Sequence, residues 1–213
     1  LAGLGVNINI CPDKIGEYID TIGIGFLFAP KLHSTMKYTM TPRKEMGIRT
    51  VFNILGPLSN PAFAEHQILG VYDGKLTETI AQVLNKLGVK TAAVVHGRDG
   101  LDEITLTDYT KISMLKDGEI NTYQFNPVDY DFHLCAVEDL KGGNVNENIE
   151  IINAILSGKP SAKTDVAILN AAFAIMLGGK ANDLKIAIKL ARDSVFSFKA
   201  KRTLEQLVEF TNG

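Results

Sequence analysis

The chain of 213 residues is long enough for one large α/β domain, with ordinary shares of apolar (46%) and charged (22%) residues. The formal net charge of -2 gives no basic surplus for nucleic acid or an anionic membrane. Cys11 and Cys135 stand far apart, outside any metal-ligand spacing, which argues against structural zinc and is typical of reduced cytoplasmic thiols. No run of about 18 apolar residues predicts a membrane span.

The first quarter of the chain predicts a helix, a strand and a turn-rich segment. Apolar side chains at helical spacing predict a helix that starts near Pro12 and ends at Gly23. The bulky apolar residues 24–30 predict a buried strand. Residues 31–46 predict a partly helical segment, and 47–61, with two prolines and two glycines, have the composition of turns.

A strand–helix–strand rhythm follows, and we interpret it as a right-handed βαβ unit. Its expected elements are a strand over residues 66–72, a helix over 76–87 that Gly88 ends, and a strand over 91–95. Alternating runs over 104–107, 111–115 and 120–125, separated by short turns, then predict an antiparallel excursion.

From residue 137 onward the pattern predicts helices, over 149–156, 167–177, 184–195 and 203–210. The whole chain therefore predicts an α/β fold: a mostly parallel sheet flanked by helices, with a short antiparallel excursion and a helical C-terminal half. No repeat or linker divides the chain, so we expect a single domain over residues 1–213.

The motif HGRDGLDE at residues 96–103 follows a predicted strand, where ligand sites of open α/β sheets lie. Gly97 and Gly100 allow tight turns close to a ligand. Asp102 and Glu103 place two hard oxygen ligands side by side, and magnesium binds to such carboxylates together with substrate phosphates. The alternative interpretation is an exposed acidic turn.

A second group of candidates lies earlier in the chain, where His33 and Arg43 stand ten residues apart. The arginine could hold a planar carboxylate through paired hydrogen bonds, and the histidine could stack on an aromatic acid. The Gly56-Pro57 turn could form a rigid wall for a flat ligand. The alternatives are a surface arginine, a helix-end histidine and a structural turn.

Taken in order, several sequence blocks of this chain are more specific than any one of them. GIGFLFAP, GIRTVFNILGPLSNP, LGVYD, VVHGRDGLDEITLT and SGKPSAKTDVAILNAAFAIMLGGKA together resemble the anthranilate phosphoribosyltransferases over nearly the whole chain. GPLSNP and HGRDGLDE are the most distinctive of these blocks. The resemblance implies the nucleoside phosphorylase/phosphoribosyltransferase-like C-terminal domain.

The resemblance also implies a reaction and its participants. Members transfer a 5-phosphoribosyl group from phosphoribosyl pyrophosphate to anthranilate in tryptophan biosynthesis, with Mg2+ and release of pyrophosphate, usually as cytoplasmic homodimers. Asp102 and Glu103 match the family's magnesium-binding pair. The positions that match its anthranilate-binding region are His33, Met36, Arg43, Gly56 and Pro57. No residue is singled out as directly catalytic.

The sequence departs from the family at its start, and this bears on activity. Members carry a GTGGD loop and a KHGN segment that bind phosphoribosyl pyrophosphate, and neither occurs here. We therefore interpret the chain as an incomplete C-terminal domain, inactive alone. The alternatives are a pyrimidine nucleoside phosphorylase-like enzyme, a non-catalytic nucleic-acid-binding relative of the same fold, or a structural fragment without a ligand.

Overall fold

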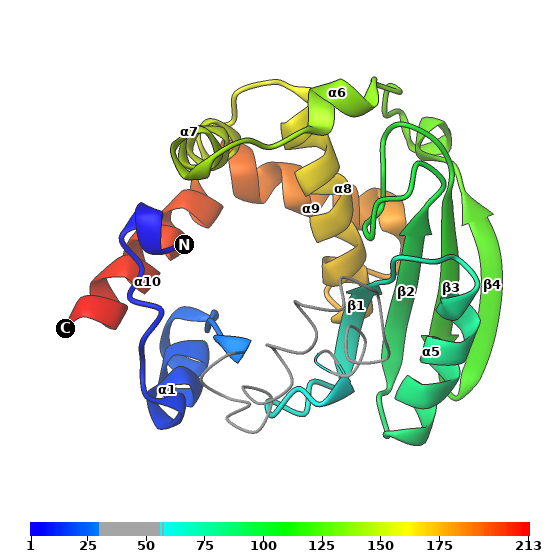
Figure 1. Ribbon diagram of the computed structural model, residues 1–213, viewed down its shortest axis with the longest axis horizontal. Helices are drawn as coiled ribbons and strands as arrows, with labels where there is room; N and C mark the ends of the chain where they lie inside the picture. The colour runs from blue at the N-terminus through cyan, green and yellow to red at the C-terminus, as the bar shows by residue number, and fades with distance from the viewer. Residues whose placement is uncertain (30–55, 57) are drawn as a thin grey trace, which may run out of the picture. The chain divides into compact units, whose positions relative to one another are not determined.

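The computed structural model describes residues 1–29, 56 and 58–213 (Figure 1). The chain divides into two compact units: Leu1–Pro61 with Lys199–Gly213, and Ala62–Phe198. The first unit contributes helices and the second contributes a four-stranded sheet with helices on both faces. The predicted α/β class is confirmed, while the single-domain organisation stays a prediction.

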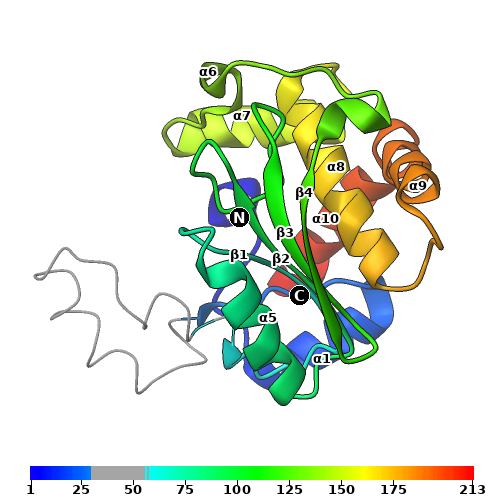
Figure 2. The same cartoon turned by 90° about the vertical axis from the view of Figure 1, so that its right-hand side faces the viewer.

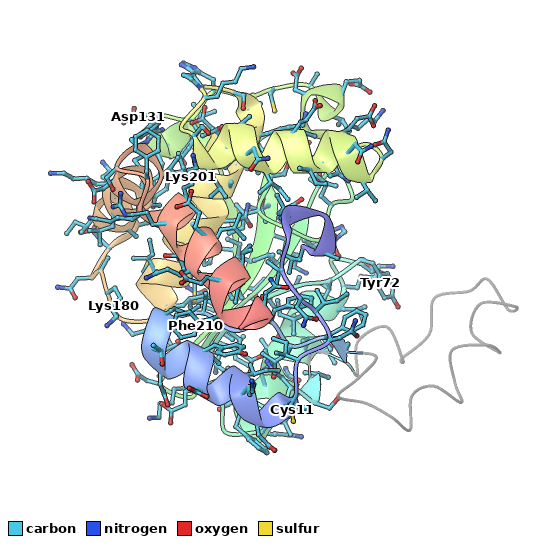
Figure 3. All side chains as sticks on the ribbon, turned by 90° about the vertical axis from the view of Figure 1, so that its left-hand side faces the viewer. Cys11, Tyr72, Asp131, Lys180, Lys201 and Phe210 are labelled. Carbon is cyan, nitrogen blue, oxygen red and sulfur yellow. The ribbon has the colours of Figure 1, made fainter. Side chains whose placement is uncertain are left out.

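In the first unit, η1 (Ala2–Leu4) precedes α1 (Pro12–Ile22), which lies beside α10 (Lys199–Asn212), as Figure 3 shows. Proline suits the first turn of α1 because it has no N–H to leave unpaired, and Gly23 ends the helix at φ 79°. The rings of Tyr18 and Phe210 join the two helices edge to face, with centroids 6.0 Å apart. The helix predicted at the start of the chain is thus confirmed.

The buried strand predicted over residues 24–30 is wrong for residues 24–29, which form no strand; Pro30 lies outside the described residues. The backbone at Gly25 packs directly on α1, because a Cβ there would lie 2.7 Å from Cγ2 of Ile15. Phe26 and Phe28 stack on each other, with centroids 6.2 Å apart. An apolar run can be buried either in a sheet or against a helix, and the sequence does not distinguish the two. Here the segment packs against a helix instead of pairing with a strand.

The sheet of the second unit has the order β1-β2-β3-β4 (Figure 1). Its strands are β1 (His66–Gly70), β2 (Thr91–Gly97), β3 (Thr110–Lys116) and β4 (Glu119–Phe125). The pair β1–β2 is parallel, joined through α5 (Leu76–Lys86) as predicted, and the next two pairs are antiparallel. Among the described strands the expectation of a mostly parallel sheet is therefore wrong, since β2 and β3 are joined without the crossover helix that parallel pairing needs.

The predicted strand over residues 104–107 is also absent, and these residues form a loop. Its backbone bonds to side chains instead of to a neighbouring strand. Ile104 donates its N–H to Oδ1 of Asn170 (3.1 Å), and Thr105 donates its N–H to Oγ1 of Thr110 (3.1 Å). The two other predicted runs are confirmed as β3 and β4, which the left-handed pair Asp117 (φ 52°) and Gly118 (φ 81°) joins in a tight hairpin.

Helices cover both faces of this sheet (Figure 2). α5 packs on one face of β2 and β3, and α8 (Ala162–Leu177) packs on the other. The main core lies on the α8 face and also includes α9 (Leu184–Phe196). The remaining helices of this unit are η3 (Pro127–Tyr130), α6 (Val137–Leu140) and α7 (Val145–Leu156), so the helical C-terminal half is confirmed. None of the helices among the described residues has both the length and the apolar character to cross a membrane.

Candidate functional site: the acid loop beyond β2

The acid loop, which we define as residues 98–107, follows β2 at the edge where the parallel strands β1 and β2 both end. The loop turns back at once, because Gly97 donates its N–H to the Leu101 carbonyl (2.8 Å) and Gly100 donates to the Gly97 carbonyl (2.9 Å). Gly100 has a φ of 95°, a conformation that other residues rarely adopt. This turn brings Asp102 and Glu103 back toward the end of β1.

Asp99 holds the loop together from inside. Its carboxylate accepts hydrogen bonds from the hydroxyls of Thr105 (2.6 Å) and Thr107, and from the N–H of Leu101 (3.0 Å). Burial opposes ionisation, but these donors outweigh it and lower the pKa of Asp99 below its ordinary value. Sequence reasoning missed this residue, although D-x₅-T-x-T spacing after a strand was visible in the sequence.

We predict that Asp99→Asn lowers the free energy of unfolding at pH 7 by on the order of 1 kcal/mol, allowing for solvent screening. A lowered folded-state pKa means that the ionised carboxylate stabilises the fold above the unfolded-state pKa of about 3.9. That contribution is lost as the pH falls through the lower folded-state value. Urea unfolding at pH 7 and in steps below pH 4 measures the difference.

Asp117→Asn is the matched control, because Asp117 is exposed in the β3–β4 turn and asparagine tolerates its left-handed conformation. We expect the gap between Asp99→Asn and wild type to shrink on acidification, while the control follows the wild type throughout. A gap that is independent of pH would mean that the charge of Asp99 does not stabilise the loop.

Asp102 lies against the backbone of β1. A Cβ on Gly70 would overlap the Asp102 carbonyl oxygen and lie 2.5 Å from its carbonyl carbon. From the other side, Asn170 of α8 binds both the N–H and the carbonyl of Ile104, the residue that follows the acid pair (3.1 and 2.8 Å). The pair is therefore held at the end of β1 by a close backbone contact and by one half-buried amide side chain.

Negative charge is concentrated at this site. Burial, then the charge of Asp102, then that of Asp99 raise the pKa of Glu103 above its ordinary value. A raised pKa shows that the folded chain resists ionisation of Glu103, and a cation would relieve that cost. Two adjacent hard carboxylates fit Mg2+, which takes the rest of its shell from water or substrate phosphates.

A complete protein-only metal cage is not present among the described residues, where no group of three or more His, Cys, Asp and Glu side chains could hold a metal. A magnesium ion at Asp102 and Glu103 would therefore need oxygen atoms from a ligand. That requirement suits a site in which metal and an anionic substrate bind together.

Most of the predicted anthranilate-binding residues fall outside the part of the chain that the structure describes. His33, Met36, Arg43 and Pro57 lie outside the described residues. Gly56 is described, and its carbonyl accepts the N–H of Ser59 (3.2 Å) in a short turn. It belongs to the first compact unit, whereas the acid loop belongs to the second. The binding roles of all five residues stay predictions.

The chain matches known proteins over almost its full length. The family model described as "Glycosyl transferase family, a/b domain" matches residues 1–201. The anthranilate phosphoribosyltransferase of Acetivibrio thermocellus is 47% identical over 212 residues, which cover 100% of this chain and 61% of that protein. The enzyme of the same name from Desulfosudis oleivorans is 48% identical, with coverage of 99% and 62%. The chain thus spans about three fifths of the length of these relatives, and the expected resemblance is confirmed.

Solved structures of enzymes with the same name have a similar fold. Anthranilate phosphoribosyltransferase from Thermus thermophilus has a TM-score of 0.93 at 34% identity, covering 100% of this chain and 63% of that chain. The Saccharomyces cerevisiae enzyme in complex with PRPP and Mg has a TM-score of 0.90 at 26% identity, with coverage of 99% and 61%. The same yeast enzyme has been solved with 4-fluoroanthranilate. Over its described residues, the chain therefore has the fold of the corresponding part of these enzymes.

Proposed function

This chain belongs to the glycosyl transferase family through its a/b domain, and we propose that it is the C-terminal part of an anthranilate phosphoribosyltransferase. The observation that carries the proposal is identity of 44–48% to enzymes of that name along essentially the whole chain. The proposed reaction joins the amino group of anthranilate to C1 of the ribose in phosphoribosyl pyrophosphate and releases pyrophosphate, a step of tryptophan biosynthesis in the cytoplasm. We also propose that the full-length enzyme is a homodimer.

In this proposal Asp102 and Glu103 hold Mg2+ together with oxygens of the pyrophosphate. The metal would neutralise the negative charge that grows on pyrophosphate as it leaves. The rigid contacts of the acid loop support this role: the Asp99 hydrogen bonds and the Gly70 contact hold the pair in place before the ligand arrives. The magnesium complex of the yeast relative supports the choice of metal.

The remaining residues of the proposed site hold the acceptor. Arg43 would bind the carboxylate of anthranilate, with His33, Met36, Gly56 and Pro57 around the ring. The aromatic amine is neutral near pH 7 and needs little help from a base, so orientation of the acceptor is the main contribution of these residues.

We predict that Arg43→Ala, in a chain completed with its N-terminal part, raises the KM for anthranilate and changes the KM for phosphoribosyl pyrophosphate little. Loss of a charge-assisted hydrogen bond is worth about 1.5–3 kcal/mol. Steady-state kinetics with each substrate varied in turn measure the two constants. Arg43→Lys keeps the charge but not the paired geometry, and we expect an intermediate KM. Equal effects on both substrates would contradict the assignment.

The proposed function is tested by comparing two polypeptides. One is this chain alone; the other is this chain joined to the N-terminal part of a bacterial relative, which supplies the GTGGD and KHGN segments. We expect magnesium-dependent consumption of anthranilate, followed by its fluorescence, only in the joined polypeptide. A joined polypeptide that is folded by circular dichroism but inactive would contradict the proposal, as would phosphorolysis of pyrimidine nucleosides, the alternative activity.

A further inference from the structure

A row of polar side chains crosses three strands of the sheet at the end where β2 finishes. His96 pairs with Lys111 in the β2–β3 register, and Lys111 pairs with Gln124 in the β3–β4 register. Paired residues of neighbouring strands point to the same face of a sheet. The three side chains therefore lie side by side on one face of strands β2, β3 and β4.

This row lies on the α5 face. His96 approaches Gly74, the second residue before α5, so closely that a Cβ on that glycine would lie 3.0 Å from the imidazole ring. From there α5 runs toward the opposite end of the strands, where the side-chain amide of Asn85 donates to the carbonyl of Gly118 in the β3–β4 turn (3.1 Å). In Figure 2, α5 lies in front of the sheet and runs toward that turn. The helix begins beside the polar row and covers the sheet beyond it.

An open cavity of about 590 Å³ occupies the space over the row, entirely within the second compact unit. We call it the β2-end cavity. Its lining residues are Asp73, Gly74, Lys75, His96, Arg98, Tyr109, Lys111 and Gln124.

The cavity has more positive than negative charge. Three of its side chains are cationic, Lys75, Arg98 and Lys111, and they come from three separate elements: the turn before α5, the acid loop and β3. Lys111 donates to an uncharged acceptor, the Gly74 carbonyl (2.8 Å). Arg98 lies 3.9 Å from the Asp108 carboxylate with 72% of its side chain exposed, a weak surface pair.

The negative and neutral groups that line the cavity do not neutralise its excess of positive charge. Its single carboxylate among the lining residues, Asp73, accepts the backbone N–H of Lys75 (2.9 Å). His96 hydrogen-bonds through Nδ1 to the Val71 carbonyl (2.8 Å), so Nδ1 carries a proton and Nε2 is the other polar atom of the ring. Within the described residues, the Lys75 ammonium has no acidic partner.

The acid pair lies on the other face. Gly70 pairs with Val95 in the β1–β2 register, so its missing side chain would point to the same face as Val95, which packs in the main core beneath α8. Asp102 occupies that space. His96 follows Val95 and points to the α5 face, because side chains alternate along a strand. The β2-end cavity and the backbone of Asp102 therefore lie on opposite faces of the sheet.

We propose that the β2-end cavity is a second anion site, which binds the phosphate group of a small organic phosphate without a metal. Three cations from three elements, with His96 and Gln124 as polar neighbours, suit the several acceptor oxygens and double charge of a phosphate monoester. Tyr109, which is 43% exposed, forms a flat wall for the organic part of the ligand. The inference does not depend on the proposed reaction.

The test is calorimetric titration of this chain with ribose 5-phosphate, and separately with inorganic phosphate, in metal-free buffer containing a chelator. The test variant is Lys75→Gln with Arg98→Gln, two exposed side chains whose replacement we expect the fold to tolerate. The matched control is Lys116→Gln, on an exposed lysine at the far end of β3. We expect saturable binding whose Kd rises at least about tenfold in the test variant and is unchanged in the control.

Each other outcome overturns the proposal. Absence of saturable binding would show that the cavity is not a site, and equal weakening in both variants would show only nonspecific attraction. Tighter binding of benzoate than of ribose 5-phosphate would assign the cavity to carboxylates. In a parallel titration with magnesium in place of the chelator, binding that appears only with the metal and is lost in Asp102→Asn would place the ligand at the acid pair instead. Because no anthranilate turnover is measured, failure here leaves the proposed reaction untouched.

Discussion

Replacing Gly70 with alanine is expected to lower the free energy of unfolding of the sheet-containing unit by about 2 kcal/mol or more. The added Cβ would overlap the Asp102 carbonyl oxygen, so the acid loop must move away from β1. Backbone cannot rotate out of the way as the end of a flexible side chain can. Urea unfolding followed by far-ultraviolet circular dichroism measures the loss, and amide exchange should localise it to the acid loop and the end of β1.

Gly16→Ala is the control, because it should change the free energy of unfolding in the opposite direction. Gly16 lies inside α1, and a Cβ there would meet nothing within 4 Å. Alanine in an exposed helix is favoured over glycine by about 0.5–1 kcal/mol, so this variant should be slightly more stable than the wild type. If Gly70→Ala were also neutral or stabilising, the loop would not be held against β1 as described.

The prediction from sequence was accurate where the signal is local. Helix α5, with its apolar face and the glycine that follows it, and the two strands that flank it are set by residues that are neighbours in the chain. It failed for residues 24–29 and 104–107, which are as apolar as strands. Whether such a run pairs with a strand or packs on a helix depends on distant partners, here Ile15 and Asn170.

The acid pair could be found from the sequence because adjacent carboxylates after a strand and two glycines form a compact motif. The residues that position the pair could not be found in the same way. Asn170 lies 66 residues from Ile104, and its role as a structural clamp for the loop follows only from their contact in space.

The cationic β2-end cavity also depends on residues that are far apart in the chain, so it could not be predicted from the sequence. Lys75, Arg98 and Lys111 are widely spaced along the chain, and each is an ordinary surface residue when considered alone. Only the register of β2 and β3 and the starting point of α5 bring them to one cavity. A motif search would not detect such a site, because its residues come from three different elements.

The double substitution Asp102→Asn with Glu103→Gln, in the joined polypeptide, is expected to lower turnover at least about 100-fold. Both changes keep the shape of the side chain and remove the charge that holds magnesium. In any residual activity, the magnesium concentration for half-maximal rate should rise, because amides are weaker ligands than carboxylates. Assays across a range of magnesium concentrations, with both substrates saturating, measure both effects.

Stability distinguishes loss of metal binding from loss of fold in this variant. Because the pKa of Glu103 is raised in the folded chain, its contribution to stability is present below the unfolded-state pKa of about 4.3 and is lost as the pH rises through the folded-state value. At pH 7 Glu103→Gln should therefore leave the metal-free chain as stable as the wild type or more stable, while abolishing any stabilisation by magnesium and phosphoribosyl pyrophosphate added together. Unchanged magnesium dependence of the rate would show that Asp102 and Glu103 form only an exposed acidic turn.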